Sequence, residues 1–179
     1  QEEIVDLFHW QRATSTVFRS DILAIRKMAK DNFFLHMEKL NQRSVFIKLQ
    51  NLVFLIVADD SIQYQLLEAI LEEMHHSFFE QYAGVLQTFL PGMEGILKTF
   101  EESLPVVCEK AKKDRIFWIT VACTMCEKKR YQIYVRKSLI SQAKSFPVSL
   151  VYRHEGHGLL IYLDSDSKIR GTEIVEITG

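Results

Sequence analysis

Two pairs of residues in the second half of the sequence have the types and the spacing of metal ligands. Cys123 and Cys126 are two residues apart in the stretch TVACTMCEKKRYQIYV, and His154 and His157 have the same separation in YRHEGHGLL. Two thiolates and two imidazoles can hold one zinc ion in a tetrahedron. Both pairs lie in predicted hairpin turns, which is the geometry that zinc knuckles use. The sequence therefore offers one candidate metal site, and zinc is the cofactor that it would take.

Other features of the same residues favour a site without metal. The stretch CTMC lacks the Pro and Gly that usually shape a knuckle, and 27 residues separate it from His154, more than a finger usually has. If the strand continues through Cys123, its pleat places Cys123 and Cys126 on opposite faces. In that case Cys123 is a core residue and the histidines are exposed. A thioredoxin-like redox role fits poorly, because that motif opens a helix and this one follows a strand.

Composition restricts the classes of function. The chain has 179 residues, 47% of them hydrophobic, with 22 Lys and Arg against 23 Asp and Glu. Without excess positive charge there is no strong nucleic-acid signal. The longest apolar run, LVFLIVA, is far shorter than the ~20 residues that span a bilayer, so no transmembrane segment is expected. Three cysteines are few for a secreted scaffold. We expect a cytoplasmic protein, or one peripheral at membranes.

The elements that must position the candidate site follow from periodicity. Three strands with tight turns are predicted at 33–40, 44–49 and 52–59. The first two alternate between apolar and polar residues, whereas the third, LVFLIVAD, is apolar on both faces. We therefore expect the third strand to be central in an antiparallel sheet that has helices on both faces.

Helices are predicted on either side of these strands in the sequence. A long helix begins near 59–61, with Asp and Ser as caps, and continues to about residue 82. A second covers PGMEGILKTFEESL (91–104), and Pro105 should end or kink it. A short helix is predicted at 20–32. Residues before it either form a strand pair or extend that helix from residue 14.

The order of elements in residues 1–112 resembles the longin domain. The resemblance rests on this order, on the doubly apolar LVFLIVADDS before a capped helix, and on GMEGILKTFEESL, which is similar to a last longin helix. It implies an α/β (α+β) fold and a subunit or adaptor in membrane trafficking or small-GTPase regulation. The implied partner is a small GTPase or another longin or roadblock subunit. No ligand signature defines the family, so the resemblance transfers no functional residue.

The remaining residues, 113–179, are rich in strands. Five aromatic and β-branched runs with one short helical interruption repeat the order of the first half. They predict either a second, truncated longin-like or roadblock-like module or a β-meander that packs on the first sheet.

No phosphate loop, activated nucleophile or general acid pair is visible in the sequence, so we do not expect an enzyme. The predicted function is that of a non-catalytic protein–protein interaction module, which forms a dimer or a hetero-complex. The alternative is a zinc-stabilised module of the C-terminal β unit that binds a small ligand or nucleic acid. Stoichiometric zinc would favour the second prediction.

Overall fold

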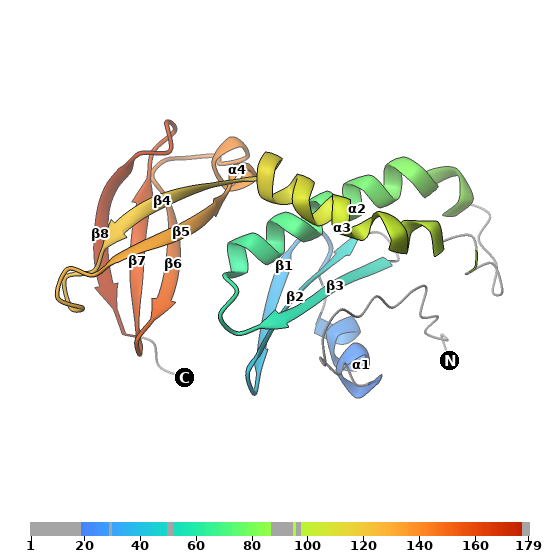
Figure 1. Cartoon of the computed structure of the whole chain (residues 1–179), viewed down its shortest axis with the longest axis horizontal. Helices are drawn as coiled ribbons and strands as arrows, with labels where there is room; N and C mark the ends of the chain where they lie inside the picture. Colours follow the sequence, from blue (N-terminus) through green and yellow to red (C-terminus); the bar gives the residue numbers. More distant parts are fainter. Residues whose placement is uncertain (1–18, 29, 50–51, 87–94, 96–97, 177–179) are drawn as a thin grey trace. The chain divides into compact units, whose positions relative to one another are not determined.

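The structure is a computed structural model that describes residues 19–28, 30–49, 52–86, 95 and 98–176. The chain divides into two compact units, Gln1–Arg115 and Ile116–Gly179. Figure 1 shows the elements of each unit.

The N-terminal unit is built on an antiparallel meander. Strands β1 (Phe34–Lys39), β2 (Gln42–Leu49) and β3 (Leu52–Asp59) form a three-stranded sheet in the order β1-β2-β3. Direct pairs such as Val45 with Ile56 fix the register between β2 and β3. As in any β-strand, successive side chains of β2 point to opposite faces of the sheet.

Two long helices, α2 (Tyr64–Leu86) and α3 (Lys98–Asp114), cover one face of this sheet. Their inward side chains recur at three- and four-residue spacing, which places them on one face of each helix. Aromatic rings dominate the core, and Phe78 contacts Phe100 edge to face with ring centroids 5.1 Å apart. The buried cluster of helix and strand residues consists of Val45, Ile47, Phe54, Leu67, Leu71, Phe78, Tyr82, Phe100 and Leu104.

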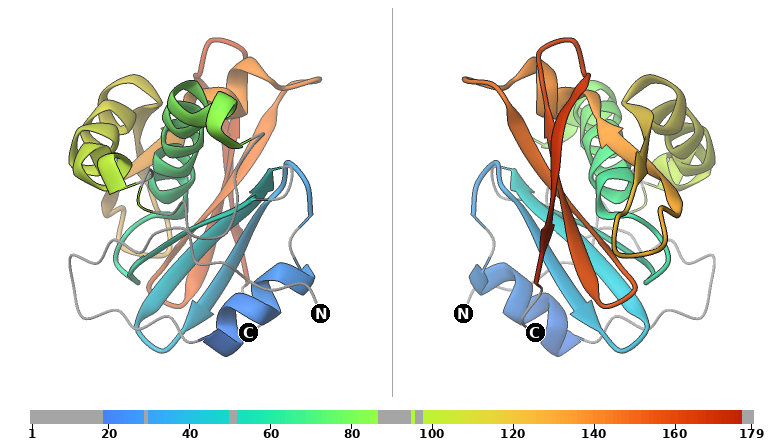
Figure 2. Two further views of the ribbon diagram at one scale, coloured as in Figure 1. Left: turned by 90° about the vertical axis from the view of Figure 1, so that its right-hand side faces the viewer. Right: turned by 90° about the vertical axis from the view of Figure 1, so that its left-hand side faces the viewer.

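The second face of the sheet is also covered. Phe46 lies between Val45 and Ile47 in β2 and so points the opposite way, yet all three are buried. Helix α1 (Arg19–Met28) lies on the side opposite to α2 and α3, and its Ile25 is buried. Figure 2 shows this arrangement from two directions. The predicted α+β class, with an antiparallel sheet and helices on both faces, is confirmed.

Among the described strands, β2 lies between β1 and β3. The strand pair predicted before residue 19 lies outside the described residues, so the central place of the third strand stays a prediction. One helix extends past its predicted end. Helix α3 continues through Pro105 to Asp114. Since Val107 and Ala111 are buried after the proline, as Phe100 and Leu104 are before it, tertiary packing outweighs the missing backbone donor.

A buried ion-pair network closes the end of this unit. The carboxylate of Glu73 on α2 is only 1% exposed, and its two oxygens lie 2.5 Å from Lys110 Nζ and 2.6 Å from Arg115 Nε. These contacts join α2 to the end of α3. Burial alone would raise the pKa of Glu73, but the hydrogen bonds from Lys110 and Arg115 outweigh it and lower that pKa.

In its described residues, the C-terminal unit contains five strands and one short helix, in the predicted order. Its elements are β4 (Ile116–Ala122), β5 (Arg130–Arg136), α4 (Lys137–Ser141), β6 (Val148–His154), β7 (His157–Leu163) and β8 (Ile169–Val175). They form a two-stranded sheet, β4-β5, and a three-stranded sheet, β6-β7-β8. The likeness of this unit to a truncated longin or roadblock module stays a prediction.

An aliphatic core joins the two small sheets. It consists of Ile119, Val121, Ile133 and Val135 from the first sheet and Leu150, Leu159, Ile161 and Leu163 from the second. Because these residues alternate along their strands, each sheet has one inner and one outer face. In the part of the chain that the structure describes, no helix has the length and apolar character needed to cross a bilayer.

Candidate metal centre

The four residues singled out in the sequence lie together in the C-terminal unit. The two Sγ atoms of Cys123 and Cys126 and one ring nitrogen each of His154 and His157 all lie within 4.8 Å of one another. In a tetrahedral zinc site, bonds of about 2.0–2.3 Å separate the ligand atoms by roughly 3.5 Å. An ion would therefore need to draw these four atoms only slightly closer. Among the described residues, this is the one group of three or more potential ligands with such spacing.

The two cysteines are brought together by a tight turn between β4 and β5. Strand β4 ends at Ala122, and Glu127 and Lys128 then take left-handed backbone conformations, with φ of 48° and 61°. The amide of Cys123 donates to the carbonyl of Lys129 at 3.0 Å, and the amide of Lys129 donates to the carbonyl of Cys126 at 2.7 Å. The chain thus curls back and returns Cys126 to Cys123.

This turn removes two of the sequence arguments against a metal. The pleat does not separate the cysteines, because the strand stops before Cys123. Nor is glycine needed, because Glu127 and Lys128 adopt the positive φ that glycine adopts more readily. Cys123 is fully buried, as the alternative predicted, but the prediction of exposed histidines is wrong: His154 and His157 are both half-buried.

The two histidines share a face because of the hairpin between β6 and β7. His154 and His157 are directly paired across the strands. The two residues between them, Glu155 and Gly156, have φ of 45° and 82°, as a two-residue type I′ turn requires. Residues paired across such a turn point to the same side of the sheet. Both imidazoles therefore face the cysteine turn.

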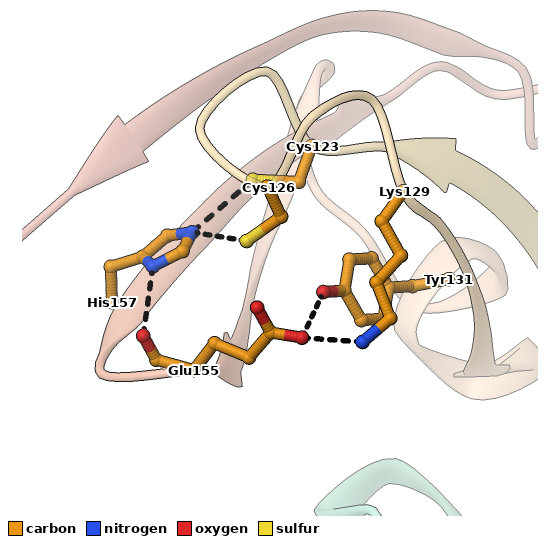
Figure 3. A network of polar contacts seen from close by, with 6 residues as sticks. All are labelled: Cys123, Cys126, Lys129, Tyr131, Glu155 and His157. Carbon is orange, nitrogen blue, oxygen red and sulfur yellow. Dashed lines mark hydrogen bonds and ion pairs between the residues drawn. The ribbon is translucent and has the colours of Figure 1, made fainter.

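His157 is oriented by its backbone neighbour. Its Nε2 lies 3.2 Å from Cys123 Sγ and 3.7 Å from Cys126 Sγ, while its Nδ1 lies 3.3 Å from the carbonyl oxygen of Glu155 (Figure 3). An Nδ1–H that donates to a carbonyl leaves Nε2 to bind a metal, which is the usual arrangement of histidine ligands.

His154 supplies an independent indication of a ligand. Both of its ring nitrogens are shielded from solvent, and among the described residues neither has a hydrogen-bond partner of normal geometry, although the ring lies close enough to Cys123 to lower the pKa of that thiol. The ring packs against those of Tyr131 and His157, each with centroids 4.3 Å away, and against Tyr152. A buried imidazole without a partner loses its hydration without compensation. A metal ion bound to one of the two nitrogens would satisfy that nitrogen.

The surroundings shift the pKa values of the two thiols in opposite directions, and they favour the thiolate at Cys123. Burial raises the pKa of Cys123, but the imidazoles of His157 and His154 lower it by more, to about 6. Burial and the neighbouring Cys123 raise the pKa of Cys126. The contact with Cys123 raises the pKa of His157. Both shifts favour a Cys123 thiolate beside a protonated His157, and thiolate is the form that binds metal.

Three further residues surround the four potential ligands, and the sequence analysis did not identify them. Lys129 Nζ lies 2.5 Å from Glu155 Oε1, and the Tyr131 hydroxyl donates to the same oxygen at 2.9 Å (Figure 3). The ion pair with Lys129 is the main cause that lowers the pKa of Glu155, to about 2. The sequence shows a basic residue three positions after Cys126 and an acidic residue between the two histidines, but their contact depends on how the two hairpins meet.

The arrangement is suited to holding an ion and not to exposing one to a substrate. Four protein ligands complete a tetrahedron, whereas catalytic zinc sites keep one position for water or substrate.

A scan against protein-family models, a search of curated proteins and a search of solved structures each gave no match.

Proposed function

We propose that this chain is a non-catalytic module whose C-terminal unit binds one structural zinc ion through Cys123, Cys126, His154 and His157. The observation that carries the proposal is the convergence of these four ligand atoms within 4.8 Å from two separate hairpins. The buried, unpartnered nitrogens of His154 support it.

The ligand types favour zinc among the common biological metals. Thiolate and imidazole together suit a borderline-soft ion in tetrahedral geometry, whereas Mg²⁺ and Ca²⁺ take six or more oxygen ligands. The stabilising role follows from position. The ion would link the β4–β5 turn to the β6–β7 turn at one end of the unit. It would thus add a link between two hairpins that also meet in the aliphatic core.

The zinc content of the purified chain tests this proposal. We expect one zinc per chain after purification under reducing conditions, measured by elemental mass spectrometry. Cys126→Ser and His154→Ala should each lose most of the metal. Cys108→Ser is the matched control, because Cys108 is the third free cysteine and lies on α3. Wild-type protein without metal, or variants that keep full occupancy, would contradict the proposal.

A second proposed function is that of a protein–protein interaction module. Its support is an aromatic pair on the outer face of the β4-β5 sheet. Trp118 is 61% exposed, Tyr134 is 37% exposed, and the two are directly paired across the strands. Exposed aromatic side chains are frequent anchors at interfaces. The resemblance of the N-terminal unit to longin domains makes the finer proposal a subunit or adaptor in membrane trafficking or small-GTPase regulation.

Affinity purification from the native host tests this second proposal. We expect wild-type chain to recover a small GTPase or another longin or roadblock subunit, and Trp118→Ser with Tyr134→Ser to lose it. Val106→Ser is the control, because Val106 is 70% exposed and lies on α3, which belongs to the N-terminal unit. Recovery of the same partner by the double variant would show that this face is not the interface.

A further inference from the structure

We infer that the metal centre is assembled before the ion binds, with Glu155 as the residue that positions the two ligand turns, so that zinc enters and leaves a folded unit. This inference rests on the proposed zinc site and concerns how that site is occupied.

Glu155 contacts both ligand turns. Its carboxylate accepts from Lys129 and from Tyr131, which belong to the β4–β5 hairpin. Its backbone carbonyl faces Nδ1 of His157. One residue between the two histidines therefore links the cysteine turn to the histidine turn and sets the orientation of one ring (Figure 3). Neither contact needs a metal ion.

The unit also has a core that does not include the four ligand residues. The aliphatic core contains residues from β4 and β5 on one side and from β6 and β7 on the other. Both ligand turns are anchored at the ends of paired strands, with Ala122 opposite Arg130 and His154 opposite His157. This differs from small zinc fingers, which have little core and unfold when the metal is removed.

The effects of a substitution on metal affinity and on melting temperature distinguish a residue that positions ligands from one that stabilises the fold. The side chains of Lys129 and Glu155 are 61% and 48% exposed, and exposed ion pairs contribute little to folding. Loss of this pair should therefore hardly change the melting temperature. Partners that orient metal ligands have a larger effect on binding, typically tenfold or more in metal affinity. An affinity loss without a stability loss is the signature of a positioning residue.

The experiment uses the full chain, stripped of metal under reducing conditions and titrated with Co²⁺ against a competing chelator. Co²⁺ gives absorption bands that report thiolate and imidazole ligation. We expect Glu155→Ala and Lys129→Met to bind Co²⁺ about tenfold more weakly, with the same band shape as wild type because all four ligands remain. Lys129→Arg keeps the positive charge and should therefore bind Co²⁺ about as tightly as wild type. Lys168→Met is the matched control, because Lys168 pairs with Asp166 on the surface of the same unit.

Hydrogen exchange of the metal-free chain tests assembly directly. The amides of Cys123 and Lys129 make the two hydrogen bonds that close the cysteine turn. We expect both to be protected in metal-free wild type and exposed in Glu155→Ala, while Ile133 and Ile161 in the core strands stay protected in both.

Four results would overturn the inference. Unprotected core amides in metal-free wild type would show that metal binding and folding are one event. Unchanged Co²⁺ affinity in both variants would show that Glu155 has no positioning role. A fall in affinity matched by a fall of ten degrees in melting temperature would make Glu155 a structural residue. Absence of Co²⁺ bands from wild type would instead refute the zinc site, and with it the inference.

Discussion

The N-terminal unit buries its sheet beneath two long helices, whereas the C-terminal unit packs two small sheets against each other and gathers four ligand-type side chains at one end. The first core contains the large aromatic side chains of Phe54, Phe78 and Phe100. The second is aliphatic, and its one helix, α4, has five residues, none of them buried.

The difference shows two ways to stabilise a small antiparallel sheet. Helices add apolar area in proportion to their length, and α2 alone has 23 residues. A unit without such helices has less area to bury, and below about 70–80 residues one core rarely contributes more than about 3–5 kcal/mol. Small units often add a metal or disulfides instead. The two units also differ in their buried charges, since Glu73 lies among cations whereas Cys123 lies among imidazoles.

Removing the metal should produce the largest difference between the units. Zinc held a thousandfold above its Kd contributes about 4 kcal/mol, and each kcal/mol corresponds to about 4–8 °C in a unit of this size. We therefore expect chelation to lower the melting temperature of the C-terminal unit by about 15 °C or more and to leave that of the N-terminal unit within about 2 °C. Calorimetry of the full chain, with and without zinc, measures both transitions. Equal shifts in the two would refute this division of roles.

Glu73→Ala should have the next largest effect, and in the opposite unit. Removing one partner of a buried ion pair costs about 3–5 kcal/mol when the remaining charge stays buried. Here Lys110 and Arg115 are 47% and 33% exposed and can turn to water, so we expect about 2 kcal/mol. Denaturant unfolding should show a destabilised N-terminal transition. Zinc content should not change, and a loss of zinc in this variant would contradict the independence of the two units.

Acid should weaken the N-terminal unit through the same carboxylate. The pKa of Glu73 is lowered below its ordinary 4.5, so its charged form is favoured in the folded state. Its contribution is complete above about pH 4.5 and is lost as the pH falls through the lower, folded-state pKa. We expect the N-terminal melting temperature to fall more between pH 6 and pH 3 in wild type than in Glu73→Gln. Parallel pH profiles for the two proteins would show that Glu73 contributes nothing to acid sensitivity.

The sequence predicted the fold class well because the signals were local and periodic. The strand LVFLIVAD was predicted at 52–59 and lies there, and the long helix continues four residues past its predicted end. Helix α3 was predicted less well, because the continuation past Pro105 depends on the burial of Val107 and Ala111, which is a tertiary effect.

The candidate site was predicted less completely from the sequence than the fold class was. Its four residues could be named from type and spacing, but their convergence depends on backbone conformations that the sequence does not announce. Glu127 and Lys128 are unusual residues at positive φ, and their presence made the cysteine turn look unlike a knuckle. The Lys129–Glu155 contact spans 26 residues, and no local pattern predicts which charges of two hairpins will meet.

The smallest expected effect tests the conformation of the cysteine turn. Lys128 has φ of 61°, a conformation that costs a residue with a Cβ about 1 kcal/mol more than glycine. Lys128→Gly should therefore be more stable than Lys128→Ala by about 1 kcal/mol, although glycine is usually the less stable choice. Both variants lack the lysine side chain, so their difference reports the backbone alone.

Glu109 in the N-terminal unit provides the control for this comparison, because it is an exposed residue inside helix α3, five residues before the helix ends. There glycine costs about 1 kcal/mol relative to alanine, so Glu109→Gly should be less stable than Glu109→Ala. The sign of the glycine–alanine difference should reverse between the two positions when each is measured from the melting of its own unit. If Lys128→Gly is also the weaker variant, the turn does not have the left-handed conformation that returns Cys126 to Cys123. The convergence of the four ligands would then lose its structural basis.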